Sequence, residues 1–364
     1  MIPEVILAII VVSYVLQVLL FMYGLSHLRD RRSNTSKPFV SVVIAARNEE
    51  AALADCLRAL SVQSYPQTLY EVIVVNDNST DRTQDICDQF RRQHSNFQSV
   101  SAAVLPSHPG KTGALIQGIE QSKGEIIMIT DADCTAPPTW IESTVLRYSP
   151  DVGIVGGMTL QKAVSPFGGM QSLDWAYLLG IASSSAALGT PLSTIGNNLS
   201  FRRAAYDSVG GYRALPFSIT EDYSLFQAII NTGTWKYLYP LDPAVVVSSR
   251  PCGRWIDLVR QKHRWAKGGL KMRPIGFLVM AVGFAYHTSI AVSLFSGSFL
   301  LASILLACKL IADYFFLHRI LSRLQQKQEL RWFIWFELYF LLYVVALPFV
   351  VFFGGKVLWK ERSY

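Results

Sequence analysis

Apolar residues gather at the two ends of the chain in runs longer than a globular core helix needs. Four such runs are present: residues 3–24, 274–295, 297–317 and 332–354. Each is long enough to cross about 30 Å of hydrocarbon as a helix. The pattern therefore predicts a transmembrane anchor in residues 1–26 and a transmembrane region of about three spans in residues 274–364.

Between these ends, residues 38–250 alternate between short β-branched runs and helical patterns. The predicted strands are residues 40–45, 72–75, 100–105 and 126–129. The predicted helices are residues 49–60, 81–93 and 111–121, with Ser79 and Thr80 expected to cap the second of them. This alternation is typical of an α/β domain with a mostly parallel sheet, whose ligands bind at the carboxyl ends of the strands.

Residues 251–273 show the pattern of an amphipathic helix. One side holds four apolar residues: Trp255, Leu258, Val259 and Ala266. Basic residues surround them: Arg254, Arg260, Lys262, Arg264 and Lys267. A basic helix that carries tryptophan typically lies in the plane of the lipid headgroups. Residues 167–188 are predicted to be either a second interface helix or a core helix.

Composition and charge agree with a membrane location. Hydrophobic residues make up 51% of the chain and charged residues 16%, below the roughly 25% usual for soluble domains. Basic residues, which give the net charge of +7, cluster beside the apolar runs, at 27–32, 250–273 and 318–331. This placement indicates membrane-flanking charge rather than a nucleic-acid-binding face. It predicts that the region between the anchors lies in the cytosol.

The side of the C-terminus stays open. A single last span places Lys356, Lys360 and Arg362 outside, against the positive-inside rule. Alternatively, Pro348 and the pair Gly354-Gly355 break this stretch into a re-entrant or interfacial segment.

Acidic and basic motifs follow one another in a fixed order. They are Val74-Val75-Asn76-Asp77, Asp131-Ala132-Asp133, Thr220-Glu221-Asp222 and Gln261-Lys262-His263-Arg264-Trp265. Carboxylates at strand ends project into a ligand crevice, and an Asp-x-Asp pair can hold a divalent cation through hard oxygens. That cation can hold a diphosphate. A later carboxylate can serve as a base, and a Gln/Arg/Trp cluster can clamp the leaving phosphates.

Each motif also has a plainer interpretation. Asp77 stands in an Asn-Asp-Asn sequence, which is turn chemistry, and Asp222 stands where an acidic residue favours a helix start. Lys111 follows a Pro-Gly pair without the upstream glycine spacing of a P-loop, so it is either a ligand contact or a surface lysine. A dinucleotide-binding dehydrogenase is not predicted, because Arg47-Asn48-Glu49 stands where its glycine-rich loop belongs.

Taken in order, the motifs resemble those of glycosyltransferase family 2, inverting enzymes with a GT-A fold. The similar subgroup is membrane-bound and includes cellulose and hyaluronan synthases and ceramide glucosyltransferases. The resemblance covers residues 38–273 and implies a Rossmann-like GT-A catalytic domain in residues 38–250, between transmembrane helices. Further local matches are Ala46-Arg47-Asn48-Glu49-Glu50, Gly110-Lys111-Thr112-Gly113-Ala114, the residues from Gly196 to Arg203, and Gly210-Gly211-Tyr212-Arg213.

The resemblance implies a role for each motif. Asp222 is the expected catalytic base, which takes the proton of the acceptor hydroxyl. Asp131 and Asp133 are expected to hold Mn²⁺ or Mg²⁺. The expected acceptor-side residues are Glu221, Trp265 and Asn198. The expected donor-binding residues are Arg47, Glu49, Asp77, Lys111, Asp131, Gln261, Arg264 and Trp265.

The number of spans favours a lipid acceptor over a polymer, because about four spans can hardly enclose a sugar-wide channel. The main charged residues in these spans are Lys309, Asp313 and Glu337, and such residues are functional suspects. We predict an integral membrane protein, of a bacterial inner membrane, that moves a sugar from a UDP-sugar to the hydroxyl of a membrane lipid without processivity. The alternatives are a processive polysaccharide synthase that acts as an oligomer or with a partner subunit, and a catalytically silent scaffold.

Overall fold

The computed structural model describes residues 2–28, 32–359 and 362–363. These residues form two compact units. The helical unit combines Met1–Leu28, Gln161–Leu192 and Pro251–Tyr364, and the sheet unit combines Arg29–Leu160 and Ser193–Arg250. The basic run predicted to follow the first span includes residues 29–31, which lie outside the described residues.

The sheet unit is built on a central β-sheet. Its strands are β1 (Val40–Ala46), β2 (Tyr70–Asn76), β3 (Phe97–Ser101), β4 (Ile126–Ile129), β5 (Val152–Gly156), β7 (Leu199–Arg202) and β8 (Lys236–Leu238). Among the described residues they form one seven-stranded sheet in the order β3-β2-β1-β4-β7-β5-β8. All neighbours are parallel except β7, which is antiparallel to β4 and β5. The mostly parallel sheet is therefore confirmed. A separate pair joins β6 (Thr159–Gln161) to β9 (Val247–Ser249).

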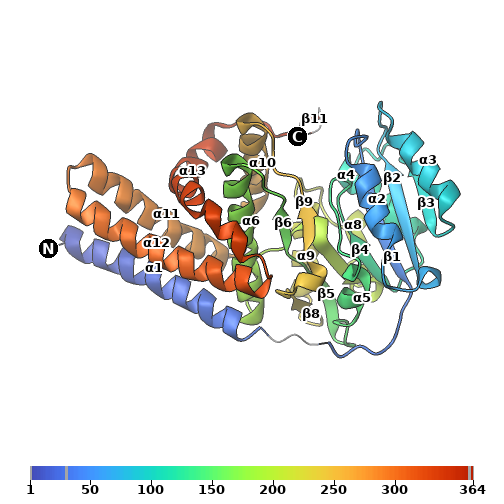
Figure 1. Cartoon of the computed structure of the whole chain (residues 1–364), viewed down its shortest axis with the longest axis horizontal. Coiled ribbons are helices and arrows are strands. Elements are labelled where there is room, and N and C mark those ends of the chain that lie inside the picture. Colours follow the sequence, from blue (N-terminus) through green and yellow to red (C-terminus); the bar gives the residue numbers. More distant parts are fainter. Residues whose placement is uncertain (1, 29–31, 360–361, 364) are drawn as a thin grey trace. The chain divides into compact units, whose positions relative to one another are not determined.

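Helices cover both faces of this sheet (Figure 1). They are α2 (Leu53–Ser61), α3 (Thr83–Gln93), α4 (Lys111–Gln121), α5 (Trp140–Val145), α7 (Arg203–Asp207), α8 (Gly211–Ala214) and α9 (Glu221–Asn231). Val42 and Val74 pack with α2, α3 and α5 on one face, whereas Ile73 and Val75 pack with α4 on the other. Because both faces are buried, the strands read as continuous apolar runs.

Hydrogen bonds between loops explain where the prediction of element bounds was wrong. α2 begins at Leu53 rather than residue 49, because the backbone of Glu49 donates to Thr83 Oγ1 at 2.8 Å in the next loop. α3 begins at Thr83, whose backbone amide donates to Asp81 Oδ1 at 3.0 Å. The predicted cap by Ser79 and Thr80 is therefore wrong.

The third strand also differs from the prediction, because it spans Phe97–Ser101 rather than residues 100–105. β3 ends at Ser101 because the next residues bond to a helix instead of extending the sheet. The amide and carbonyl of Ala103 both bond to the side chain of Gln117 on α4, at 2.8 and 2.9 Å.

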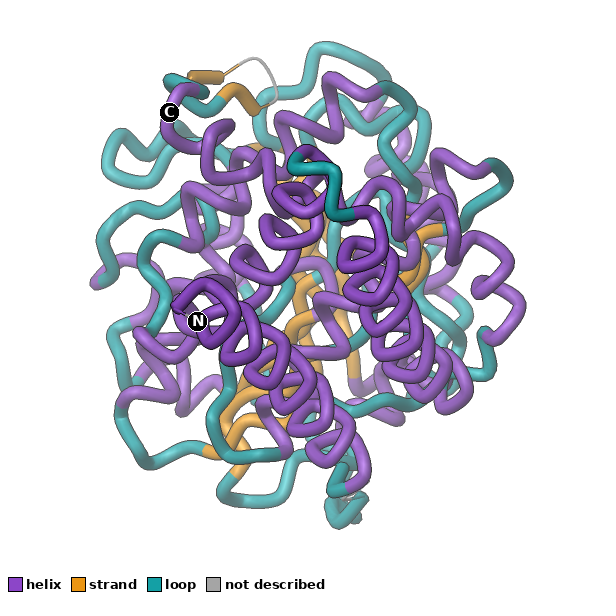
Figure 2. Tube along the Cα trace, turned by 90° about the vertical axis from the view of Figure 1, so that its left-hand side faces the viewer, coloured by secondary structure: helices purple, strands orange, loops and turns teal. Residues whose placement is uncertain are grey.

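Helices dominate the helical unit, where they are purple in Figure 2. They are α1 (Ile2–Ser26), α6 (Pro166–Ala187), α10 (Trp255–Gly269), α11 (Pro274–Phe295), α12 (Phe299–Arg323) and α13 (Phe333–Phe353). A short strand pair follows, β10 (Leu358–Trp359) with β11 (Arg362–Ser363). α1, α11 and α12 run side by side (Figure 1). α13 continues through Pro348 and ends just before Gly354-Gly355, so no break occurs at the proline.

Four helical segments of the described chain are long and apolar enough to cross a membrane. They are Glu4–Ser26, Pro274–Phe295, Phe299–Arg323 and Lys327–Phe353. All four overlap the predicted spans, and their bounds differ from the prediction by at most six residues. Their outward faces carry exposed apolar side chains, such as Ile9 on α1 and Leu342 on α13, which is the surface that lipid requires.

α6 is buried over most of its length and packs with α1, α12 and α13. Its start is well defined, since Pro166 is in the first turn and the Ser165 hydroxyl accepts from the Gly168 amide at 3.2 Å. Small residues let its neighbours approach: Ser184 Oγ donates to the Phe21 carbonyl at 2.7 Å. Of the two interpretations of residues 167–188, the core helix describes this packing.

Charged and polar side chains from four helices meet inside the helical unit. Lys309 of α12 pairs with Asp313, at 2.8 Å, and with Glu337 of α13. Asp313 Oδ1 accepts hydrogen bonds from Tyr14 of α1 at 2.8 Å and Tyr177 of α6 at 3.0 Å. Ionisable groups in such surroundings persist only when they are paired, so this network fixes how the helices meet.

The packing of α4 on the sheet provides a test of the fold. A Cβ atom added at Gly118 would lie 2.5 Å from Val43 Cγ1 and 2.9 Å from Val75 Cγ2. Gly118→Val is expected to cost about 1–3 kcal/mol through overpacking, and so to lower the melting temperature of the purified protein by several degrees. Gly253→Ala is the control, because a Cβ atom there meets nothing within 4 Å. Equal melting temperatures for the two variants would contradict this close packing.

Candidate active site

Three parallel strands bring the first two motifs to one edge of the sheet. In the register of the sheet, Ala46 at the end of β1 faces Asn76 at the end of β2, and Val43 of β1 faces Ile129 at the end of β4. Asp77 directly follows β2, and Asp131 stands two residues beyond β4. The carboxyl edge of the sheet therefore carries both motifs, as predicted.

The loops after β1 and β2 are held together by hydrogen bonds. Arg47 donates from its guanidinium group to the carbonyl oxygen of Asp77 at 3.0 Å, and Asp77 donates its amide to the Ala46 carbonyl at 2.8 Å. Asn48 and Asn78 have positive φ angles of 52° and 55°, which asparagine tolerates better than most residues. Hydrogen bonds therefore join the loop that contains Arg47 and Glu49 to the loop that contains Asp77.

Lys111 connects the second and third motifs. Gly110 turns the chain into α4 with φ +70°, a conformation that favours glycine, and Lys111 is the first residue of the helix. Its Nζ atom lies 2.6 Å from Asp131 Oδ1 and 3.2 Å from Glu221 Oε1. One ammonium group therefore bridges the Asp-x-Asp motif and the start of α9, 90 residues further along.

The electrostatics of this site are dominated by carboxylates. Burial alone lowers the pKa of Lys111, but Asp131, Glu221 and Asp222 together raise it well above its usual value. Burial, followed by the charges of Asp133 and Asp131, likewise raises the pKa of the Cys134 thiol far above normal. The raised pKa favours the protonated thiol of Cys134 at neutral pH. Three carboxylates, those of Asp131, Glu221 and Asp222, surround the single ammonium group of Lys111, so the site retains negative charge that favours a further cation.

Asp222, in the first turn of α9, lies close to the backbone of Gly196. A Cβ atom added at Gly196 would lie 3.0 Å from both Cβ and Oδ2 of Asp222, so a larger residue there would press on this side chain. Burial, then Glu221 and Asp222, raise the pKa of Tyr212. The hydroxyl of this buried tyrosine has no hydrogen-bond partner among the described residues. Asp222 thus has a fixed position beside the residues that Lys111 joins.

Two carboxylates in the Asp-x-Asp motif suit a divalent cation. Asp131 is 34% exposed at its side chain, so its oxygens are accessible from solvent. Mg²⁺ and Mn²⁺ commonly take one or two protein carboxylates and fill their other positions with phosphate oxygens and water. Clusters of three or more metal-ligating side chains are absent from the described part of the chain. The residues present fit such an ion with a bound diphosphate.

The remaining predicted residues have other surroundings. Asn198 is buried, and both of its amide protons are donated, to the carbonyls of Met158 and Val245 at 2.8 and 2.9 Å. Its Oδ1 accepts from Trp140 at 2.9 Å. An acceptor-side role for Asn198 stays a prediction. Gln261, Arg264 and Trp265 lie on α10 in the helical unit, and their roles toward the donor also stay predictions.

Sequence reasoning missed two residues at this site. Tyr212 and Gly196 both belong to segments that match the family, but no chemistry could be attached to them from the sequence. A tyrosine in a Gly-Gly-Tyr-Arg segment gives no sign that its hydroxyl is buried beside carboxylates 9 and 10 residues later. Only the path of the chain between α8 and α9 reveals it.

Comparison with known proteins identifies chains of similar sequence and fold. A chain of similar sequence, a beta-monoglucosyldiacylglycerol synthase of Synechocystis sp., is 30% identical over 246 residues, which are 65% of this chain and 49% of that protein. A poly-beta-1,6-N-acetyl-D-glucosamine synthase of Staphylococcus epidermidis is 29% identical over 245 residues, 63% of this chain and 54% of that protein. The chain thus spans about half the length of the curated relatives it matches.

The fold is shared with a solved mannosyltransferase of Pyrobaculum calidifontis, whose structure is described as a complex with GDP-Man and Mn²⁺. The TM-score is 0.61 at 19% identity, with 96% of this chain and 99% of that chain covered. The expected membrane glycosyltransferase with a GT-A fold is confirmed by these likenesses. The family model that matches residues 5–364 is that of glycosyl transferase family 21. Because this match covers nearly the whole sequence, the chain belongs to glycosyl transferase family 21.

Proposed function

We propose that the protein transfers a sugar from a nucleoside diphosphate sugar, UDP-linked in the first instance, to the hydroxyl group of a membrane lipid, with inversion at the anomeric carbon. The observation that carries this proposal is the contact of Lys111 with both Asp131 and Glu221. It gathers the residues proposed for donor binding and for proton transfer around one point. Similarity to a glycolipid synthase supports the acceptor class.

In the proposed reaction, Asp222 accepts the proton of the lipid hydroxyl while its oxygen attacks the anomeric carbon. The bond from that carbon to the β-phosphate oxygen breaks, and the nucleoside diphosphate leaves as an anion that needs no proton. Arg47, Glu49 and Asp77 hold the nucleotide, and Lys111 and Asp131 lie at the diphosphate. A divalent cation held by Asp131 and Asp133, when bound, neutralises charge on the leaving group.

The remaining proposed roles belong to the motif on α10 and to Glu221. Gln261 and Arg264 bind the diphosphate, for which a planar guanidinium group is well suited. Trp265 offers a ring face to the sugar or the acceptor. Glu221 helps to position the acceptor and is itself held by Lys111 at 3.2 Å. We further propose that the reaction takes place on the cytosolic side of a bacterial inner membrane.

The interior of the helical unit favours a single transfer over processive synthesis. A growing polysaccharide needs a passage as wide as a sugar. In the described part of the unit, α6 occupies the centre, and the rings of Tyr177, Phe316, Phe336 and Phe340 pack against one another there. The alternative, a polysaccharide synthase that acts as an oligomer or with a partner subunit, is favoured by similarity to the poly-N-acetylglucosamine synthase.

Product mass separates these two proposals. Purified protein is incubated with a panel of UDP- and GDP-sugars, Mn²⁺ or Mg²⁺, and a bacterial lipid extract, and products are weighed by mass spectrometry. The expected product is a lipid that carries one added sugar and extracts into organic solvent. A polymer that stays in the aqueous phase would favour the synthase. Absence of donor turnover with every sugar and both cations would contradict the proposal as a whole.

The base assignment predicts a selective loss in Asp222→Asn. Asparagine keeps the shape of the side chain but cannot accept the proton, so kcat is expected to fall about 10²–10⁴-fold. Affinity for UDP with Mn²⁺, measured by calorimetry, is expected to stay within about threefold, which is under 1 kcal/mol. Asp151→Asn is the control, because Asp151 forms a surface ion pair with Lys236 in the same unit. Equal turnover of the two variants would show that Asp222 is not the base.

The metal assignment predicts a different loss in Asp133→Ala. Removal of one of two carboxylate ligands is expected to weaken Mn²⁺-dependent UDP binding about 10-fold or more, because metal ligands and their immediate partners typically contribute factors of this size. Binding of UDP in EDTA is expected to match the wild type. If Mn²⁺ strengthens UDP binding equally in both proteins, Asp133 is not a ligand.

A further inference from the structure

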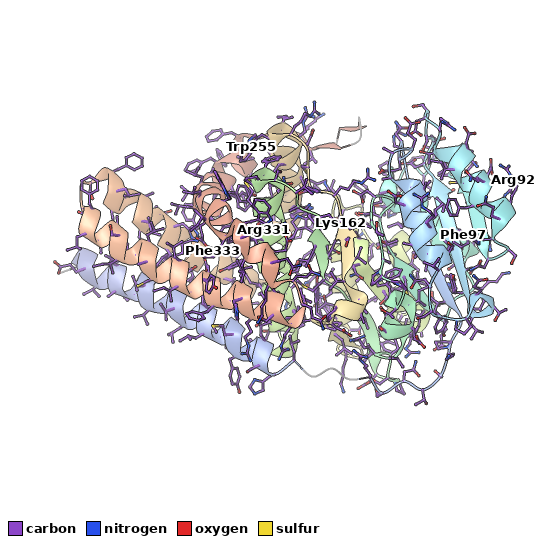
Figure 3. The ribbon with its side chains drawn as sticks, viewed as in Figure 1. Arg92, Phe97, Lys162, Trp255, Arg331 and Phe333 are labelled. Carbon is purple, nitrogen blue, oxygen red and sulfur yellow. The ribbon has the colours of Figure 1, made fainter. Side chains whose placement is uncertain are left out.

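A buried ion pair joins α10 to α6 within the helical unit. Lys262 of α10 is 3% exposed and contacts the carboxylate of Asp174, which is fully buried on α6. The amphipathic pattern predicts Lys262 among the basic residues that face the lipid headgroups, and this prediction is wrong. Trp255, on the same helix, is instead 59% exposed and projects from it (Figure 3).

The ammonium group of Lys262 is also enclosed by aromatic rings. It lies 4.5 Å from the ring centre of Trp265, one turn along α10, and 5.2 Å from that of Tyr343 on α13. Both distances are within the range of a cation–π interaction. The ring of Trp265 in turn packs against Trp175 of α6 at 5.3 Å. One side chain thus links α10 to two other helices and touches the tryptophan of the Gln-x-x-Arg-Trp motif.

Helix geometry connects the contacts of Lys262 to the orientation of the Gln-x-x-Arg-Trp motif. Gln261, Arg264 and Trp265 are spaced i, i+3 and i+4, so they share one face of α10. Lys262 follows Gln261 and points about 100° away around the helix, as the 3.6-residue period requires. An anchor at this position fixes the rotation of α10 about its axis. Leu258, one turn earlier, is buried on the same side as Lys262, but apolar packing is not directional and resists rotation less than a charge-assisted hydrogen bond does.

We propose that Asp174 and Lys262 are positioning residues, which hold α10 in the one rotation that presents Gln261, Arg264 and Trp265 to the nucleoside diphosphate donor. The inference rests on the proposed function, because it assigns the pair an effect on the same donor. Neither residue touches substrate. Lys262 and His263 stand at the two variable positions of the Gln-x-x-Arg-Trp motif. Lys262 differs from His263 because it sets the orientation of Gln261, Arg264 and Trp265.

The test compares neutral replacements of the pair with a matched variant on the same helix. Asp174→Asn/Lys262→Met removes both charges and keeps side chains of similar size, which avoids an unpaired buried charge. Tyr177→Phe is the control, because it removes a hydrogen bond from α6 to Asp313 of α12, one turn from Asp174, and keeps the ion pair of Asp174 with Lys262. Full-length protein in detergent is assayed for UDP affinity with Mn²⁺, donor KM, kcat and melting temperature.

The double variant is expected to weaken UDP affinity and raise donor KM about tenfold, whereas Tyr177→Phe leaves both unchanged at a similar melting temperature. Lys262→Arg, which keeps the charge beside Asp174, is expected to recover part of the affinity. When Arg264→Ala is added to the double variant, affinity is expected to fall no further than in Arg264→Ala alone, because positioned and positioning groups act as a unit.

Three results would overturn the inference. Additive losses in that cycle would mean that the pair does not act through Arg264. Wild-type affinity in the double variant, when Arg264→Ala alone weakens binding, would exclude a positioning role while leaving the proposed function intact. Unchanged UDP affinity in Arg264→Ala would remove both the inference and the proposed role of the motif.

Discussion

The neutralisation of carboxylates at the carboxyl edge of the sheet is the constraint on which the site depends. Parallel strands bring their carboxyl ends to one edge, so the motifs after β2 and β4 lie there, and Lys111 connects the second of them to the start of α9. Carboxylates this close repel one another, and the repulsion grows as water is excluded. Lys111 offsets this repulsion, because its Nζ atom lies 2.6 Å from Asp131 and 3.2 Å from Glu221. Without this cation, the carboxylates of the Asp-x-Asp motif and of the start of α9 would face one another with less of their charge neutralised.

Much of this arrangement could be predicted from the sequence, because local signals and topology agree. β4 and α4 were predicted to the residue, since each apolar run ends at a clear polar boundary such as Gly110-Lys111 or Thr130-Asp131. Parallel order then places Asp77 and Asp131 at the same edge without knowledge of any contact. The membrane spans were equally clear, because the length of an apolar run is itself the signal.

The failures have physical reasons as well. Lys262 was assigned to the surface because an amphipathic pattern records only the residue's own polarity, whereas its burial depends on Asp174, 88 residues earlier. The antiparallel strand β7, Leu199–Arg202, has four residues and no distinctive period. Ser79 and Thr80 do not cap α3 because both bond to Asn48 in a different loop, and the amide of Thr83 at the helix start donates to Asp81 instead. In each case a partner distant in sequence decided the outcome.

Three buried or nearly buried lysines, Lys111, Lys262 and Lys309, each neutralise carboxylates, but solvent access divides them. Lys262 and Lys309 pair with carboxylates that are at most 5% exposed at their side chains, so their partners cannot be exchanged without a large desolvation cost. Asp131, the partner of Lys111, is 34% exposed. Water and a hydrated cation can reach that carboxylate, and the ammonium group can keep Glu221 while Asp131 takes a new ligand. Burial therefore makes two of these ion pairs permanent parts of the helix packing and leaves the third able to exchange, at the place where a charged donor has to bind and leave.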